Sequence, residues 1–395
     1  MRFLSLGPTA LANSFLESPE EFATEPMFPL DVYFCEDCSL VQLLDVIAPE
    51  VLFRHYIYLT GTSETICDHY REYADEVAQV AKLEADDLVV EVASNDGSLL
   101  RCFDRLPIKT LGVEPATNIA ERAQASGIET LNEFFDAEAA ARIREMHGPA
   151  KAVIGNNVLA HVDDTLDFLT GCARLLAQGG RVVVEVPYVR DLVERLEYDT
   201  IYHEHLCYFS VTNLLRLFER AGLRISRVRH VPVHGGSLRV YGRRAEEDAN
   251  HAADVLVMAE LEAAMGYTEL ALYASMATAV EANRAALVTL LGDLRSEGKS
   301  VAAYGAPAKG NTLLNFCEID TDLIPYTVDR NPLKVGTLTP GMHIPVLPVS
   351  TLLERRPDYV LILAWNFADE IMRQQAEYRE GGGQFILPIP EPRVV

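Results

Sequence analysis

Hydrophobic positions in the middle of the chain follow two alternating patterns. Short runs that are apolar almost throughout begin near Leu88, Ala152 and Arg181, and longer stretches with helical spacing of apolar residues separate them. A strand buried on both faces of a sheet produces such a run, whereas a helix with one buried face repeats about every 3.6 residues. The alternation therefore predicts an α/β fold, with a parallel sheet covered by helices on both faces.

Two other regions flank this alternating segment, which covers residues 71–245. Residues 1–70 are irregular and rich in proline and aromatic residues, with strand-like FPLDVYF and SLVQL on either side of a cysteine pair. From residue 246 an alanine-rich helical stretch leads into a second, smaller α/β unit with strand-like SVAAYG, IPYTVD and DYVLIL. A chain of 395 residues is too long for one hydrophobic core, so we expect three domains, 1–70, 71–245 and 246–395.

Composition and charge limit the partners. Hydrophobic residues make up 49% of the chain and charged residues 23%, which is ordinary for a soluble globular protein. No apolar run approaches the roughly 20 residues that cross a bilayer, and no signal-peptide pattern opens the chain, so we expect a cytoplasmic protein without a membrane partner. The formal charge of −24 argues against a nucleic-acid polymer as partner, because its phosphates would be repelled. An anionic small ligand would need a local pocket of donors and cations.

The only closely spaced cysteines are Cys35 and Cys38, and they resemble half of a zinc ribbon. A zinc ribbon needs four ligands, normally from two such knuckles, and the second pair is missing here. The two thiols are therefore interpreted either as zinc ligands in a half-site or as a reduced surface turn. The other cysteines are scattered, so a disulfide framework is not expected in a cytoplasmic protein.

The segment Leu88–Gly97 reads as a strand that runs into a turn and then a helix. Its pattern, E-x-A-x-N-D-G, places Glu91, Ala93, Asn95 and Gly97 around the turn. The turn is not G-x-G-x-x-G, so a dinucleotide is less favoured. The pattern is typical of class I methyltransferases, in which the backbone approaches S-adenosylmethionine closely. The alternative is a βα turn that binds no cofactor.

Neighbouring strands add polar residues to the same predicted edge of the sheet. Glu114 ends the second strand, where an acidic residue can hold ribose hydroxyls. The third strand ends in Asn156 and Asn157. Asn156 is therefore predicted to contact the cofactor, and the substrate side is predicted to begin at this point.

A cluster of ionisable side chains, Tyr202–His205, follows the strand that begins at Arg181. Crowded ionisable groups in an α/β chain are often sites of proton transfer. The cluster by itself has three interpretations: a metal site, a general acid/base site, or a polar surface loop. A zinc site at His203 and His205 lacks the spacing of a helical H-E-x-x-H pair.

In the last α/β unit, the segment Tyr304–Asn311 (YGAPAKGN) joins a strand to a helix. Free backbone N–H groups, the positive end of the helix and Lys309 together suit a phosphate group. We therefore predict that Lys309 and Asn311 contact the substrate. The alternative is a vestigial Rossmann-type turn with a solvated lysine.

The order of these motifs resembles that of the S-adenosylmethionine-dependent sugar C-methyltransferases of antibiotic deoxysugar biosynthesis. The resemblance runs from about Leu6 to the C-terminus and rests on LGPTALANSFL, the cysteine pair, YIYLTGTS, EVASNDGSLL, GVEP, GNNVLAHVDD, the Tyr202–His205 cluster, VHGGSLRVY and YGAPAKGNTLLN. Members of that family methylate carbon 3 of nucleotide-linked 4-keto sugars. The resemblance implies a zinc-binding N-terminal domain, a class I methyltransferase core with a Rossmann-like sheet, and a C-terminal Rossmann-like domain that helps to hold the nucleotide-sugar.

The resemblance also implies a substrate and further site residues. The substrate would be a nucleotide-linked keto-sugar, with thymidine diphosphate (dTDP) as the expected nucleotide, and S-adenosylmethionine would be the methyl donor. Asn157 is expected to line the sugar pocket, and Tyr56 to act in catalysis rather than as a core aromatic residue. We expect the protein to be a monomer.

Methylation of carbon requires a carbanion equivalent, because a neutral C–H group does not attack a sulfonium methyl group. A neighbouring ketone makes the proton removable by a side-chain base, and the enolate oxygen then needs hydrogen-bond donors. His205 is the predicted base, since the ordinary histidine pKa of about 6.5 suits proton abstraction near neutrality. Glu204 is predicted to orient that imidazole or to bind a sugar hydroxyl. Hydrogen bonds to the ketone or enolate are predicted from Tyr202, Tyr56 and His161.

Two other functions stay open. An O- or N-methyltransferase acting on another small molecule would ionise no carbon acid, so His205 would matter less. A catalytically silent nucleotide-sugar-binding protein would need neither the intact EVASNDG turn nor Glu114, and their presence argues against it.

Overall fold

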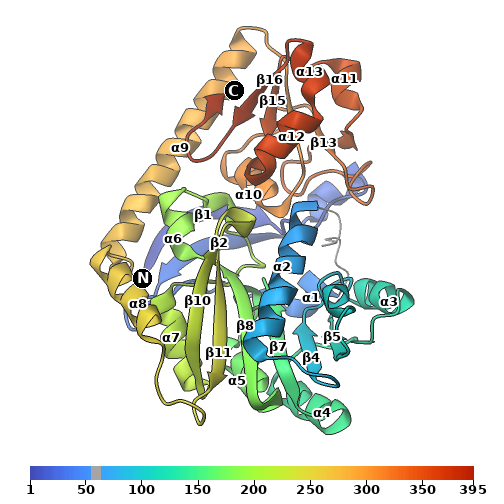
Figure 1. Cartoon of the computed structure of the whole chain (residues 1–395). Helices are drawn as coiled ribbons and strands as arrows, with labels where there is room; N and C mark the ends of the chain where they lie inside the picture. The colour runs from blue at the N-terminus through green and yellow to red at the C-terminus, as the bar shows by residue number, and fades with distance from the viewer. Residues whose placement is uncertain (55–63) are drawn as a thin grey trace.

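The computed structural model describes residues 1–54 and 64–395, and within these residues the strands form three sheets (Figure 1). The candidate catalytic residue Tyr56 lies outside the described residues. No helix in the described part of the chain combines the length and the apolar composition that a bilayer-spanning segment needs.

The N-terminal sheet is antiparallel and has the order β1-β2-β3-β9. Its strands are β1 (Arg2–Ala10), β2 (Met27–Phe34), β3 (Val41–Leu43) and β9 (Cys207–Tyr208). The last strand comes from the middle of the chain, directly after the Tyr202–His205 cluster. Pairing of β9 with β3 therefore fixes the C-terminal end of that cluster to the N-terminal domain.

The central sheet has the order β10-β11-β8-β7-β4-β5-β6. Its strands are β4 (Leu88–Val92), β5 (Lys109–Val113), β6 (Thr130–Leu131), β7 (Ala150–Asn156), β8 (Leu176–Pro187), β10 (Leu223–Val231) and β11 (Ser237–Arg244). The five strands from β8 to β6 are parallel, and β11 is antiparallel to both of its neighbours. The predicted parallel sheet is confirmed.

Helices cover both faces of this sheet. They are α2 (Glu64–Ala81), α3 (Thr117–Ala125), α4 (Ala137–His147), α5 (Thr165–Leu175), α6 (Val189–Glu194) and α7 (Val211–Arg220), and a short helix α1 (Pro49–Phe53) precedes them. Successive strand residues point to opposite faces. Val89 accordingly shares a hydrophobic cluster with Tyr73 of α2, whereas Val90 shares another with Phe168 of α5. Because α2 begins at Glu64 and packs on this sheet, the boundary expected at residue 70 falls inside a helix of the central domain.

Two long helices follow the central sheet. The helix α8 (Ala253–Ala264) packs on α7 and β10, and α9 (Leu270–Ser296) contacts both β1 and the C-terminal sheet. Figure 1 shows α9 running along one side of the molecule from the central region to the C-terminal domain. The alanine-rich stretch expected between the two α/β units therefore forms two helices, which together contact the N-terminal, central and C-terminal sheets.

The C-terminal sheet has the order β14-β13-β12-β15-β16-β17 and is parallel except for β17. Its strands are β12 (Val301–Tyr304), β13 (Thr327–Asp329), β14 (Val346–Pro348), β15 (Tyr359–Ile362), β16 (Gln384–Leu387) and β17 (Arg393–Val394). The accompanying helices are α10 (Ala308–Phe316), α11 (Thr351–Arg355), α12 (Ala368–Gln374) and α13 (Ala376–Glu380). Strand order reverses at β12, which is where ligands of such sheets bind. The predicted Rossmann-like C-terminal unit is confirmed.

The segment between β1 and β2 ties the N-terminal sheet to the C-terminal domain. Leu16 and Leu338 exchange two backbone hydrogen bonds, of 3.1 and 2.8 Å. The carboxylate of Glu25 bonds to the ring of His343 at 2.7 Å, and that ring stacks on Phe22 with 3.7 Å between centroids. The segment between β1 and β2 is therefore fastened to the C-terminal domain.

Candidate active site

One large cavity, of about 1080 Å³, lies where the central and C-terminal sheets face each other. Its lining includes the residues just beyond the carboxyl ends of β4, β5 and β7 on one side, and of β12, β13 and β15 on the other. Ligand pockets are commonly about 300–1,000 Å³, so this cavity can hold two ligands of moderate size.

The turn after β4 has a strained backbone. Ala93 and Asn95 have φ angles of 55° and 48°, in the left-handed region that costs non-glycine residues about 1–3 kcal/mol each. Gly97 has φ 75°, and a Cβ there would lie 2.8 Å from Ile128. The backbone N–H of Asn95 donates to Glu114 at 2.8 Å, which helps to hold the turn. Ala93 and Asn95 line the cavity.

Two buried carboxyl groups border this turn. Glu114 accepts the N–H of Asn95 on one oxygen and the N–H of Ala116, at 2.8 Å, on the other. Glu91 is 4% exposed, and one of its oxygens has no hydrogen-bond partner in the described part of the chain. Burial, followed by the charges of Glu114 and Asp96, raises the pKa of Glu91 well above its ordinary value. Both side chains line the cavity, and carboxyl groups there fit the ribose hydroxyls and the cationic centres of S-adenosylmethionine.

Asn156 and Asn157 stand at the end of β7 and line the cavity. Both polar atoms of the Asn156 side chain are buried and lack a hydrogen-bond partner among the described residues. Unsatisfied buried polar atoms are costly, so a bound ligand that pairs with them is favoured. Asn157 has φ 53° and donates its N–H to the carbonyl of Glu185 at 2.8 Å.

The imidazole of His205 has a partner on each nitrogen. Its Nδ1 lies 2.7 Å from the carbonyl oxygen of Thr200, and its Nε2 lies 2.9 Å from the hydroxyl of Tyr202. A carbonyl oxygen only accepts, so Nδ1 carries the hydrogen, and Nε2 is the basic nitrogen of the neutral ring. His205 and Tyr202 line the cavity. The structure thus brings the imidazole of His205 and the phenol of Tyr202 together at the cavity, and the role of His205 as base stays a prediction.

His161 comes from the short 3-10 helix η4 (Leu159–His161) and meets His205 edge to face. The two ring centroids are 4.7 Å apart and the interplanar angle is 89°. Burial, with a smaller contribution from His205, lowers the pKa of His161 well below its ordinary value. His161 is therefore neutral near pH 7 and can still donate one N–H. It also lines the cavity.

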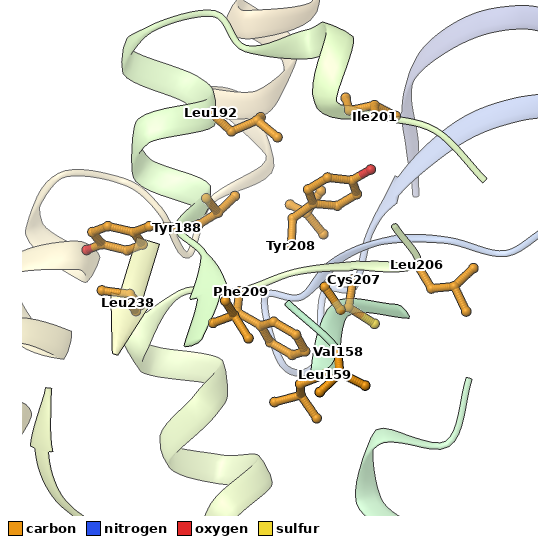
Figure 2. Close-up of a cluster of buried hydrophobic side chains, with 14 of the residues drawn as sticks. Val158, Leu159, Tyr188, Leu192, Ile201, Leu206, Cys207, Tyr208, Phe209 and Leu238 are labelled. Atoms are coloured by element: carbon orange, nitrogen blue, oxygen red, sulfur yellow. The ribbon is translucent and has the colours of Figure 1, made fainter. Parts of the chain in front are cut away.

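A hydrophobic cluster holds both ends of the Tyr202–His205 loop. Figure 2 shows Ile201 and Leu206, which flank the loop, in one buried cluster with Val158 and Leu159. The N–H of Leu206 donates to the carbonyl of Ala160 at 2.8 Å, which brings η4 beside the loop. Packing of apolar residues thus sets the spacing of the two imidazoles.

The position of Glu204 corrects one expectation. Its carboxylate is 3% exposed and accepts the side-chain N–H of Asn13 at 2.6 Å. The ring nitrogens of His205 bond instead to Thr200 and Tyr202, so the orienting acceptor is a backbone carbonyl and not Glu204. Asn13 lies in the motif LGPTALANSFL but was assigned no role from the sequence; it lines the cavity and reaches Glu204 from the N-terminal segment.

The metal interpretation of the cluster receives no support from the geometry. The ring of His203 is buried and its Nε2 lies 3.1 Å from the carbonyl of Pro29, away from the cavity lining. Cys35 and Cys38 lie between β2 and β3. In residues 1–54 and 64–395, no three or more His, Cys, Asp or Glu side chains gather as a metal site would require.

The predicted substrate residues of the C-terminal turn differ from each other. Lys309 lines the cavity, with its Nζ 3.9 Å from the ring centroid of Trp365. Burial lowers the pKa of Lys309, while the charges of Asp199 and Glu197 oppose that shift, so the ammonium is not the solvated cation of the alternative interpretation. Asn311 is 1% exposed and donates to the carbonyl of Ala12 at 2.7 Å. Asn311 therefore holds the N-terminal segment and is not part of the described cavity lining, which corrects its predicted role.

Lys334 is a cavity residue that the sequence interpretation missed. Its side chain is 8% exposed, donates to the carbonyl of Ala306 at 2.7 Å and lies 5.1 Å from the ring of Phe15. Burial lowers the pKa of Lys334, opposed by the charges of Asp329 and Glu204. The ammonium therefore stands between the C-terminal turn and the catalytic cluster. Only its position a few residues beyond the acidic end of a strand could have signalled it.

Three family models match the chain in succession. Residues 1–53 match a family described as "Putative zinc binding domain", residues 67–228 match "Methyltransferase domain", and residues 232–390 match "C-methyltransferase C-terminal domain". The order of the three matches agrees with the order of the three sheets.

A curated protein from Streptomyces niveus, the C-methyltransferase NovU, is 40% identical over 392 residues, which is 99% of this chain and 93% of that protein. Among solved structures, magnesium protoporphyrin IX methyltransferase from Synechocystis with bound SAM aligns with a TM-score of 0.35, at 14% identity, over 48% of this chain and 88% of that chain. An S-adenosylmethionine-dependent methyltransferase from Clostridium acetobutylicum aligns with a TM-score of 0.36, at 11% identity, over 45% and 91%.

Proposed function

Because the chain belongs to the C-methyltransferase family and is an S-adenosylmethionine-dependent methyltransferase with a class I core, we propose that it methylates C-3′ of a dTDP-linked 4-keto-deoxysugar. The observation that supports this proposal most directly is the pair of hydrogen bonds on His205, which leaves its Nε2 as a base beside the cavity. An O- or N-methyltransferase needs no such base to ionise a carbon acid.

In the proposed reaction, His205 removes the proton from the carbon next to the ketone. The Thr200 carbonyl, 2.7 Å from Nδ1, stabilises the imidazolium that forms. General base catalysis of this kind contributes about a hundred- to ten-thousand-fold to a rate. Nε2 no longer accepts the Tyr202 hydroxyl once it has taken the proton, so that hydroxyl is released to donate to the enolate oxygen, together with the neutral ring of His161.

The cofactor side of the cavity would be formed by the turn after β4 and its acidic neighbours. Glu114 and Glu91 would pair with the hydroxyl and cationic groups of the cofactor, and Asn95 and Asn156 with its polar edges. When bound, S-adenosylmethionine supplies an electrophilic methyl group. The chain's contribution is to place that ligand and the sugar carbon in one water-poor cavity.

The nucleotide side would be formed by the C-terminal turn. Lys334 and Lys309 are cations on the lining of a protein whose formal charge is −24, and they supply the local attraction that a diphosphate needs. Asn157, at the end of β7, would contact the sugar between the two sides. The N-terminal cysteine pair would bind zinc only with ligands beyond Cys35 and Cys38, since a zinc site takes four.

The test is incubation of the protein with S-adenosylmethionine and a dTDP-linked 4-keto-deoxysugar in deuterated water, with products followed by mass spectrometry and NMR. We expect one new methyl group on the carbon next to the ketone, and exchange of the proton on that carbon with solvent in the substrate that has not yet been methylated. A methyl group on oxygen or nitrogen, without exchange, would show an O- or N-methyltransferase. Binding of both ligands without any product would show a silent binding protein.

A further inference from the structure

We propose that the three-residue turn η5 (Tyr198–Thr200) couples the C-terminal domain to the catalytic base, with Tyr198 and Asp199 as positioning residues for His205. This inference rests on the proposed function, in which His205 is the base. Each residue of the turn makes a different contact, and the three contacts together connect two domains.

Thr200 provides the contact with the base. Its carbonyl oxygen lies 2.7 Å from Nδ1 of His205 and so determines both the tautomer and the direction of the ring. Its hydroxyl donates to the carbonyl of Glu197 at 2.7 Å, which closes the turn on itself. A shift of this carbonyl would therefore move the hydrogen-bond acceptor that aims Nε2.

Tyr198 provides the first contact with the C-terminal part of the chain. It is fully buried, and its hydroxyl donates to Oδ1 of Asn283 on α9 at 2.8 Å. The Nδ2 of Asn283 in turn donates to the carbonyls of Pro388 and Pro390, at 2.9 and 2.8 Å. The ring of Tyr198 also meets Phe316 of α10 edge to face, with 5.5 Å between centroids.

Asp199 provides the second contact. It is fully buried, and its Oδ2 accepts the indole N–H of Trp365 at 2.6 Å. The ammonium of Lys309 lies 3.9 Å from the ring centroid of the same Trp365. Ionisation of a buried carboxyl group is costly because the charge loses its contact with water. The Lys309 ammonium and the Trp365 indole N–H both offset that cost for Asp199. Asp199 therefore joins the turn to two elements of the C-terminal domain.

These contacts make η5 a rigid link between the domain proposed to bind the nucleotide and the base that acts on the sugar. The helix α10 packs directly on the turn. Small displacements of a catalytic group are expensive: a misplacement of about 1 Å can cost on the order of a hundredfold in rate. A shift of the C-terminal domain would therefore change the orientation of the His205 ring through η5. The described contacts of that ring come from other parts of the chain.

The experiment compares Trp365→Phe and Tyr198→Phe, each of which removes one hydrogen-bond donor from the link. The matched control is Tyr273→Phe, which removes a buried hydroxyl that donates to the carbonyl of Tyr267 at 2.8 Å and is not among the described contacts of η5. For each variant we would measure thermal stability, S-adenosylmethionine affinity, kcat and KM. We would also measure the rate at which the sugar proton exchanges with deuterated water in the absence of cofactor, which reports on the base alone.

We expect Trp365→Phe and Tyr198→Phe to slow proton exchange and kcat about 10- to 100-fold, with S-adenosylmethionine affinity unchanged. The conservative Asp199→Asn, which keeps an acceptor for Trp365, should slow exchange less than Asp199→Ala does. Tyr273→Phe should lose a similar amount of stability and exchange at the wild-type rate.

Wild-type exchange rates in both Trp365→Phe and Tyr198→Phe would overturn the inference and leave the turn a structural element. The variant His205→Ala separates this outcome from failure of the proposed function. If His205→Ala exchanges the proton normally, the proposed base is wrong. If His205→Ala is inactive while the two link variants are normal, the coupling alone is wrong.

Discussion

The turn after β4 and the turn after β12 use the same backbone arrangement but carry side chains of opposite charge. In the central sheet, Glu114 at the end of the second strand accepts the N–H of Asn95 from the first turn and the N–H of Ala116 two residues on. In the C-terminal sheet, Asp329 accepts the N–H of Ala306 and the N–H of Asn331, each at 2.7 Å. In both sheets, an acidic residue at the end of one strand accepts a backbone N–H from the turn that follows the neighbouring strand.

The side chains around the two turns differ. The cavity wall near the central sheet carries mostly acidic residues: Glu91, Asp96, Glu114 and Glu133, with one arginine, Arg122. The wall near the C-terminal sheet carries three cations, Lys309, Arg330 and Lys334, beside Asp329 and Glu370. The first wall suits a cationic cofactor and the second an anionic substrate, because a charged wall favours binding of a ligand of the opposite charge.

This difference would allow a protein of formal charge −24 to bind the proposed anionic substrate. Similar hydrogen bonds hold the two turns beside one cavity, and under the proposed function the charged side chains around each turn would decide which ligand binds there. His205 lies in the cavity that the two walls share. If His205 is the base, as we propose, the catalytic step would depend on both walls at once, and variants can test whether the two walls bind different ligands.

The largest loss of turnover is expected for a variant of His205, which lies in the cavity that the two walls share. His205→Ala should reduce turnover by about a hundred- to ten-thousand-fold, because it removes the proposed base. Affinity for S-adenosylmethionine, measured by calorimetry, should stay at the wild-type value, since Glu114 and the turn after β4 are untouched. Turnover near the wild-type rate would remove His205 from the mechanism.

A reciprocal pair of variants tests the comparison itself. Glu114→Gln should weaken S-adenosylmethionine binding about 10- to 100-fold, because hydrogen bonds to a charged acceptor contribute about 1.5–3 kcal/mol. Asp329→Asn, the equivalent change in the other turn, should leave that affinity unchanged and raise the KM of the nucleotide-sugar. Calorimetry and initial rates would measure the two effects. If both variants weakened the same ligand, the division of the cavity into two sites would be wrong.

A smaller effect is expected at the cationic wall. Lys334→Met should raise the KM of the nucleotide-sugar about tenfold and leave S-adenosylmethionine affinity unchanged, because one charged contact to a phosphate is worth about 1.5 kcal/mol. Lys109→Met, at an exposed position on β5, is the matched control. Steady-state kinetics at two salt concentrations would check the result. A KM unchanged from wild type would place the diphosphate elsewhere.

The smallest effect concerns Glu197, which lies between the walls near Lys309. Burial, then the charge of Asp199, raises the pKa of Glu197 from 4.5 to about 7. The folded protein therefore binds more protons than the unfolded chain between about pH 4.5 and pH 7, and stability falls as the pH rises through that window. The loss is at most about 3 kcal/mol.

Glu197→Gln should accordingly flatten the dependence of unfolding free energy on pH between pH 5 and pH 8. Urea denaturation at the two pH values would measure this. Glu145→Gln, at an exposed position on α4, should keep the wild-type slope. Equal slopes in the wild type and Glu197→Gln would show that Glu197 is ionised throughout.

Much of the fold could be predicted from the chain because its signals are local. The apolar runs beginning near Leu88 and Arg181 identify strands, since burial on both faces leaves no polar positions. The EVASNDG turn predicts the cofactor side in the same way, through residues that lie next to each other, and the structure places this turn on the cavity lining. The boundary expected near residue 70 falls inside α2, and only the packing of its Tyr73 in one cluster with Val89 of β4 shows that this helix covers the central sheet.

The partners of the side chains in and around the candidate site could not be predicted, because they come from distant segments. Glu204 faces Asn13, which is 191 positions away, and Asp199 faces Trp365, which is 166 positions away. The sequence alone determined which chemical groups the protein has and which stand at strand ends. The packing of three sheets decided which of them meet, because hydrogen bonds and buried charges depend on positions in space that local pattern does not specify.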